Sequence, residues 1–244
     1  MTHIQNMNCK NCNTEVDLNF CSNCGQPVHL KRINGHYIIH EIEHVLHFEK
    51  GILYTIRELL TRPGENIRHF VTENRSRLVK PIIFIIVSSL VYTLVNHYFH
   101  IEDGYMRFEE TAESTTGLIF KWVQSHYGYS NILMGVFIAF YLKLFFRKYE
   151  YNFFEILILL CFVMGMGMLI YTVFALVQGL THFNLMTAAG VVGFAYCTWA
   201  IGQFFDKKKV ASFLKALVSY LLGMITFMLV AILLGTSIDL IIKH

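Results

Sequence analysis

The amino-acid sequence predicts an all-α integral membrane protein in which a small cytosolic zinc ribbon and amphipathic juxtamembrane helices precede about five transmembrane helices. The first observation is composition: the 244-residue chain is 55% hydrophobic and 15% charged, with a mean hydropathy of +0.46, which is too apolar for an ordinary soluble domain. The second is a set of long apolar runs without the alternation of a membrane β-barrel. The third is a group of four cysteines near the start of the chain.

These cysteines define the first predicted domain, residues 1–30. Cys9, Cys12, Cys21 and Cys24 follow the spacing C-x2-C-x8-C-x2-C. Two C-x2-C pairs at this separation bring four thiolates within reach of one ion, which is the geometry of structural zinc. Two disulfides are the alternative, but the neighbouring residues favour metal-binding turns, as Gly25 does after Cys24. We therefore expect a structural Zn²⁺ ion here and an N-terminus in a reducing compartment, the cytosol.

Residues 31–80 are expected to form cytosolic amphipathic helices rather than a loose linker. Apolar residues at helical spacing between Val45 and Leu60 predict a first helix that ends at the segment 61–64. A second helix follows, with an apolar stripe that contains Ile67, Phe70, Val71 and Leu78. Basic residues flank this stripe, so the second helix either lies on the anionic inner leaflet or packs on the finger or the spans.

The same segment resembles a bacterial membrane-protein family known only as a domain of unknown function. The residues from Thr55 to Gly64 fit its pattern T-x-x-x-L-x-x-x-P-G, and Ile67-Arg68, Phe70, Arg75 and Pro81 follow at matching places. The chain departs from the family at Glu73-Asn74-Arg75, where the family has Gly-Lys-Arg. The resemblance covers about residues 9–95. It implies a bacterial protein with an N-terminal zinc-ribbon finger before its first span, and it implies no activity, since none is assigned to the family.

The membrane domain is predicted over residues 81–244. Its expected spans are residues 81–99, 131–146, 154–178, 185–205 and 213–242, against the roughly 17–25 residues that a helix needs to cross a bilayer. The second span is the shortest and contains Lys143, whose side chain is expected to reach the interface. Between the first two spans, Trp122 lies on the apolar face of a predicted short helix at the outer interface.

The basic residues predict the orientation of these spans. With residue 1 in the cytosol and five crossings, 17 of the 20 Lys and Arg residues fall in or beside the inside segments. Arg107, Lys121 and Lys243 fall outside. This excess follows the positive-inside rule. We therefore expect a bacterial inner-membrane protein with a cytosolic N-terminus and an outside C-terminus, in contact with the lipid bilayer and its anionic inner leaflet.

Four histidines precede the first amphipathic helix. His36, His40, His44 and His47 fall within about 80° of a helical wheel. Residues 40–44 satisfy H-E-x-x-H, the signature of a zinc metalloprotease in which Glu41 would be the general base, and this is one alternative function. No third ligand stands out, and the histidines lie opposite the apolar stripe. We therefore expect them to face outward and to form no catalytic site.

The predicted function is binding rather than catalysis. The finger is interpreted as a docking or sensing module for a protein or lipid partner, on an otherwise uncharacterised polytopic membrane protein. A transporter or channel subunit is the second alternative, but no acidic residue occupies the centre of a span. The net charge of +3 is too small to favour nucleic acid as a partner.

Overall fold

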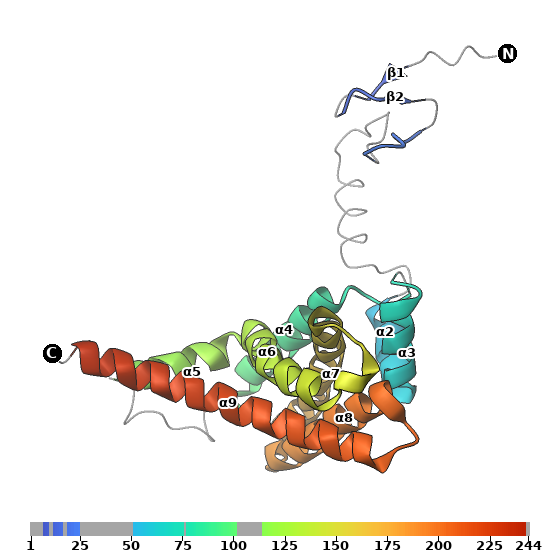
Figure 1. Ribbon diagram of the computed structural model, residues 1–244. Helices are drawn as coiled ribbons and strands as arrows, with labels where there is room; N and C mark the ends of the chain where they lie inside the picture. Colours follow the sequence, from blue (N-terminus) through green and yellow to red (C-terminus); the bar gives the residue numbers. More distant parts are fainter. Residues whose placement is uncertain are drawn as a thin grey trace. The chain divides into compact units, whose positions relative to one another are not determined.

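The computed structural model describes residues 7–9, 12–16, 19–24, 51–75, 77–101 and 114–242. The chain divides into two compact units, Met1–Val45 and Leu46–His244. In the described residues, the first unit contains a small β-hairpin and the four N-terminal cysteines, and the second contains eight α-helices (Figure 1). The predicted class, an all-α protein with five helices able to span a membrane, is confirmed.

The hairpin of the first unit positions two of the cysteines. Strand β1 (Met7–Asn8) pairs antiparallel with β2 (Glu15–Val16), so that Met7 lies opposite Val16. Between the strands, the Cys9 amide donates to the Thr14 carbonyl at 2.8 Å, and the Asn13 amide donates to the Cys9 carbonyl at 2.9 Å. Asn13 has a φ of 60°, a left-handed conformation that asparagine tolerates better than most residues. Cys9 and Cys12 therefore lie on one tight turn.

The second unit begins with two short amphipathic helices. Helices α2 (Ile52–Thr61) and α3 (Pro63–Thr72) meet at Arg62, and Pro63 occupies the first position of α3, where a missing N–H costs no helical hydrogen bond. The apolar side of α3 is buried against α7 and α8, one of the two placements that the sequence left open.

One predicted detail of this region is wrong. The stripe of the second helix was expected to include Leu78, but α3 ends at Thr72, and Leu78 is buried on the non-helical segment that leads to the first span. The helix ends where the Glu73 and Asn74 amides both donate to the His69 carbonyl, at 2.9 and 3.0 Å. Further along the chain, Pro81 disfavours helical backbone at the residue before it. Lys80 accordingly has φ −56° and ψ 127°, an extended conformation.

Five helices of the second unit are long and apolar enough to cross a membrane. They are α4 (Pro81–Phe99), α6 (Tyr127–Phe145), α7 (Phe153–Thr181), α8 (Met186–Asp206) and α9 (Val210–Ile242). The largest boundary difference concerns the second span, which begins at Tyr127 instead of residue 131 and reaches 19 residues. Its first residues are polar but compatible with a helix, so the helical backbone hydrogen bonds begin before the apolar run does. Lys143 donates to the Tyr151 carbonyl at 2.5 Å, beyond the end of the helix.

Helix α7 lies at the centre of the bundle, against α4, α6 and α8 (Figure 1). Of its most apolar stretch 67% is buried, compared with 22% for α9, which packs on α6, α8 and the short helix α5 (Thr115–Ser125). Helix α5 is the short helix predicted around Trp122. Its first amide, at Thr115, donates to the Asp239 carboxylate at 2.8 Å, so the polar residue near the end of α9 caps a neighbouring helix.

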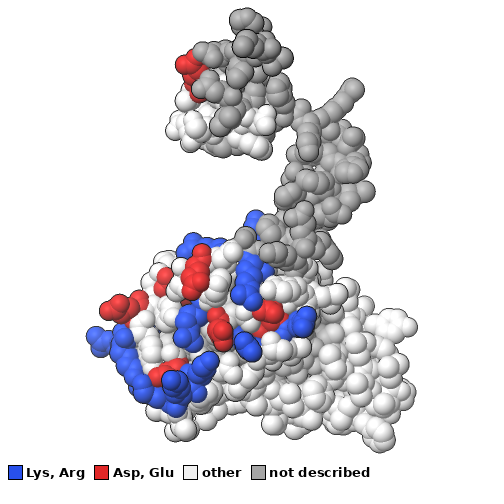
Figure 2. Space-filling view, turned by 90° about the vertical axis from the view of Figure 1, so that its right-hand side faces the viewer, with Lys and Arg blue, Asp and Glu red and all other residues white. Residues whose placement is uncertain are grey.

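Charged side chains gather at one end of the second unit (Figure 2). Exposed basic residues of this end come from α2, from the residues that flank α3, from the short 3₁₀ helix η4 (Arg147–Tyr149) and from the turn between α8 and α9. They include Arg57, Arg62, Arg75, Arg147, Lys148, Lys207, Lys208 and Lys209. Lys207 lies 4.0 Å from Glu65 of α3, so segments far apart in the sequence meet on this face.

Candidate functional site

The four predicted metal ligands lie together in the first unit. The Sγ atoms of Cys9, Cys12, Cys21 and Cys24 are all within 4.8 Å of one another, with 3.5 Å for the pairs Cys9–Cys24 and Cys12–Cys21. All four are free cysteines in this structure, which favours the metal site over two disulfides. Sulfurs bound at about 2.3 Å to one tetrahedral ion stand about 3.8 Å apart. The cluster therefore has the dimensions to hold one metal ion.

The environment of Cys12 favours the ligating form of the thiol. Its Sγ lies 3.3 Å from the Thr14 hydroxyl. Hydrogen bonds from the side chain and then the backbone of Thr14 lower the pKa of Cys12 from 9.0 to about 6. A thiolate, rather than a thiol, is the metal ligand. At neutral pH the hairpin thus presents a charged sulfur before any metal is bound.

The histidine motif lies elsewhere in the chain. His36, His40, Glu41, His44 and His47 are outside the described residues. Within the described ranges, the cysteine cluster is the single group of three or more His, Cys, Asp and Glu side chains that lie close enough to share an ion. Since all four of its positions are filled by the protein, this cluster leaves no open coordination site for a substrate.

The second notable region is the T-x-x-x-L-x-x-x-P-G segment, whose four fixed residues all face inward. Thr55 and Leu59 are each 0% exposed, and Pro63 and Gly64 are also buried. The Thr55 hydroxyl accepts from the Val79 amide at 3.1 Å, and the Leu59 carbonyl accepts from the Tyr196 hydroxyl at 3.0 Å. These contacts join α2 to the segment before α4 and to α8.

Gly64 makes the closest approach in this segment. A Cβ atom at this position would overlap the backbone of Gln203 and Phe204 in α8, so glycine alone fits. Beside it, the Arg68 guanidinium donates to the Gln203 carbonyl at 3.0 Å. The sequence marked this segment as a motif, but only the three-dimensional contacts show that the motif docks α2 and α3 onto α8.

A cavity of about 1060 Å³ lies among the spans. Helices α4, α6 and α7 form one wall, and α8 and α9 form the other. None of the described residues that line it is charged. Methionine sulfurs and tyrosine rings dominate the lining, from Tyr92, Tyr127, Met134, Met164, Met168, Tyr171, Met186, Tyr220 and Met224.

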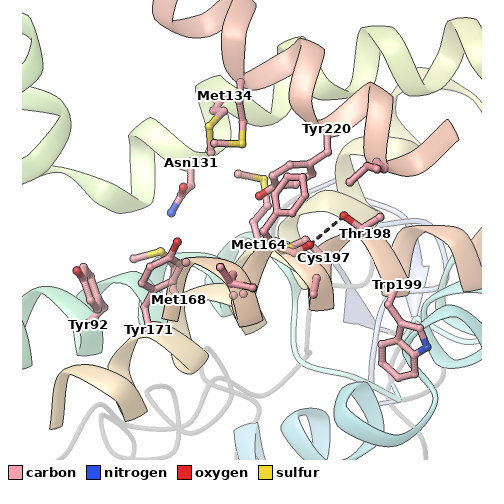
Figure 3. Close-up of a pocket in the computed structure, with 18 of the residues that line it drawn as sticks. Tyr92, Asn131, Met134, Met164, Met168, Tyr171, Cys197, Thr198, Trp199 and Tyr220 are labelled. Carbon is pink, nitrogen blue, oxygen red and sulfur yellow. Dashed lines mark hydrogen bonds between the residues drawn. The ribbon is translucent and has the colours of Figure 1, made fainter. Parts of the chain in front are cut away.

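Asn131 is the most polar feature of this cavity. The residue is 9% exposed, and its amide nitrogen Nδ2 has no hydrogen-bond partner among the residues that the structure describes. In Figure 3 the Asn131 side chain is directed towards the Tyr171 side chain, and both residues line the cavity. The sequence analysis did not identify Asn131. The available signal was an asparagine at the start of an apolar run, together with methionines one helical turn apart at positions 164 and 168.

The fold and these sites define a class: a polytopic helical membrane protein that carries a separate tetracysteine cluster. A family model described as "Protein of unknown function (DUF3667)" matches residues 49–93. The match covers α2, α3 and the first part of α4, and therefore includes the segment that docks on α8. No curated protein and no solved structure matches the chain.

Proposed function

We propose that this chain is a membrane-anchored binding protein whose N-terminal finger holds a structural zinc ion and docks a protein partner. The observation that carries this proposal is the closed cluster of four thiols. Four protein ligands suit zinc and leave no position for a reacting molecule, so the metal would stabilise a small fold. This supports a binding role for the finger itself; residues 40–44, on which the metalloprotease alternative rests, lie outside the described ranges.

The finger also offers a surface for such a partner. Phe20, next to Cys21, is 62% exposed, and we propose it as the anchor because large aromatic side chains are enriched among the residues that dominate binding energy. A docking module on the cytosolic side also agrees with the basic end of the membrane unit. We propose that this end faces the cytosol of a bacterium and contacts the anionic inner leaflet, as the positive-inside rule favours.

Photo-crosslinking in intact cells tests the docking role. A photoreactive phenylalanine at position 20 should give a discrete protein adduct, and the same group at the exposed position of Glu15 serves as the matched control. The adduct should disappear when Cys9 and Cys24 are both replaced by serine, because the finger then loses its metal. Lipid adducts alone, or equal adducts from both positions and in the serine variant, would contradict a protein-docking finger.

A further inference from the structure

The cavity among the spans opens sideways, between α8 and α9. These helices are joined by the turn at 207–209 and then separate, since α8 follows α7 whereas α9 continues along α6 to α5 (Figure 1). Val191 of α8 and Met224 of α9 line the cavity and are also exposed, at 66% and 36%. Because the surface between two spans faces lipid, a molecule dissolved in the bilayer has direct access to the cavity.

The polar groups inside the cavity select for a neutral hydrogen-bond acceptor. The Asn131 nitrogen is a donor without a partner, and hydrocarbon offers none, so an occupant with an acceptor oxygen is favoured. Tyr171, whose side chain carries a hydroxyl, lines the same cavity. In the described part of the chain, no Lys, Arg or His lines the cavity to neutralise an anion. A carboxylate or phosphate head would therefore remain unpaired there.

The apolar lining indicates the shape of the occupant. Tyr92 makes edge-to-face contacts with Tyr127 and Tyr171, with ring centroids 5.2 and 6.0 Å apart. Such rings, together with methionine sulfurs, pack favourably on a flat unsaturated ring. The volume exceeds the range of about 300–1,000 Å³ that is typical of drug-sized ligands, so it has room for a ring and the first part of a long tail.

We infer that this cavity binds a neutral, membrane-soluble amphiphile through a carbonyl oxygen, which accepts a hydrogen bond from Asn131 while the apolar tail leaves between α8 and α9. Two sources supply this chemistry, an isoprenoid quinone and a neutral glycerolipid such as diacylglycerol. The aromatic lining favours the quinone. This inference goes beyond the docking finger and does not depend on it, because every residue that it uses lies in the membrane unit.

Copurification of the full-length protein tests the inference. The protein is extracted from bacterial membranes in mild detergent, and quinones and glycerolipids are quantified per chain by mass spectrometry. Asn131→Leu keeps the size of the side chain but removes the donor, and it should lower the retained amphiphile about tenfold. Ser89→Ala is the matched control, since the Ser89 hydroxyl is another buried atom without a partner but does not line the cavity.

A second variant keeps the test decisive if Asn131→Leu fails to fold. A Cβ at Gly190 would meet only the Tyr171 hydroxyl, at 3.5 Å, so Gly190→Leu extends into open space and should also expel the amphiphile. Stripped wild-type protein should gain thermal stability with added menaquinone or with added diacylglycerol, and the stronger response identifies the source. Either source supports the inference. Equal retention in wild type, Asn131→Leu and Gly190→Leu would show adventitious lipid only and would overturn it.

Discussion

The Thr55 hydroxyl accepts a hydrogen bond from the amide of Val79, 24 residues further along the chain, and both residues are buried. The Val79 amide needs this partner because its segment is not helical, so no carbonyl one turn earlier in the chain accepts its hydrogen bond. The bond joins α2 to the entrance of the first span. Together with Gly64 against α8, it explains why threonine and glycine occupy fixed places in this segment.

Replacing Thr55 with valine should destabilise the membrane unit. Valine has the same shape but leaves the buried Val79 N–H unpaired, which costs about 1–3 kcal/mol. Thermal unfolding of the detergent-solubilised protein measures the effect. Thr55→Ser keeps the hydroxyl and is the control, and a Thr55→Val protein that melts with the wild type would disprove the role of this bond.

Gly64→Ala should separate α3 from α8. The added methyl group would overlap backbone atoms of Gln203 and Phe204, which cannot rotate away as a side chain would, and overpacking of this kind costs about 1–3 kcal/mol. Gly128→Ala is the matched control, because Gly128 is also the second residue of its helix and its Cβ would meet Ser89 at an ordinary 3.6 Å. We expect limited proteolysis to cut between α3 and α4 in the first variant and not in the second.

The purified protein should contain one zinc ion per chain. Replacing both Cys9 and Cys24 with serine should remove it, because structural zinc of this type needs all four thiolates. Cys161→Ser changes a cysteine of α7 outside the cluster and should leave the metal in place. Elemental analysis of the three proteins decides the matter. An unchanged zinc content in the double variant would assign the metal to another site.

After removal of metal by a chelator, Cys12 should react with iodoacetamide in proportion to its thiolate fraction. A pKa of about 6 places the midpoint of the rate near pH 6, so labelling is fast at pH 7 and slows as the pH falls to 5. Thr14→Val removes the largest cause of the lowered pKa and should move the midpoint towards 9.0, whereas Thr14→Ser should not. The assay is peptide mass spectrometry over a pH series, and identical midpoints in all three proteins would refute the assignment.

Reporter fusions should give alternating locations along the chain. Fusions after residues 30, 150 and 209 should report the cytosol, and fusions after residues 115, 182 and 244 should report the outside, as the 17 basic residues of the inside segments favour. A cytosolic signal after residue 244 would mean that one helix does not cross. The 19-residue length of α6 makes this outcome unexpected.

Local properties of the chain were sufficient to predict the five spans and the grouping of the cysteines. A span depends on the length of one apolar run, and a C-x2-C pair depends on one turn. Both features can therefore be predicted from residues that are adjacent in the sequence. The start of α6 and the end of α3 were harder to predict. There the backbone continues or stops for reasons that an apolar pattern does not contain, such as the two amides that share the His69 carbonyl at the end of α3.

The tertiary structure alone decided what Gly64 and Asn131 do. Gly64 is required because α8, from a distant part of the sequence, passes against it. Asn131 lacks a partner because five helices pack around a space that none of them fills. Both properties arise from how separate helices cross, and a crossing is set by the packing of side chains on all of them rather than by the sequence of any one.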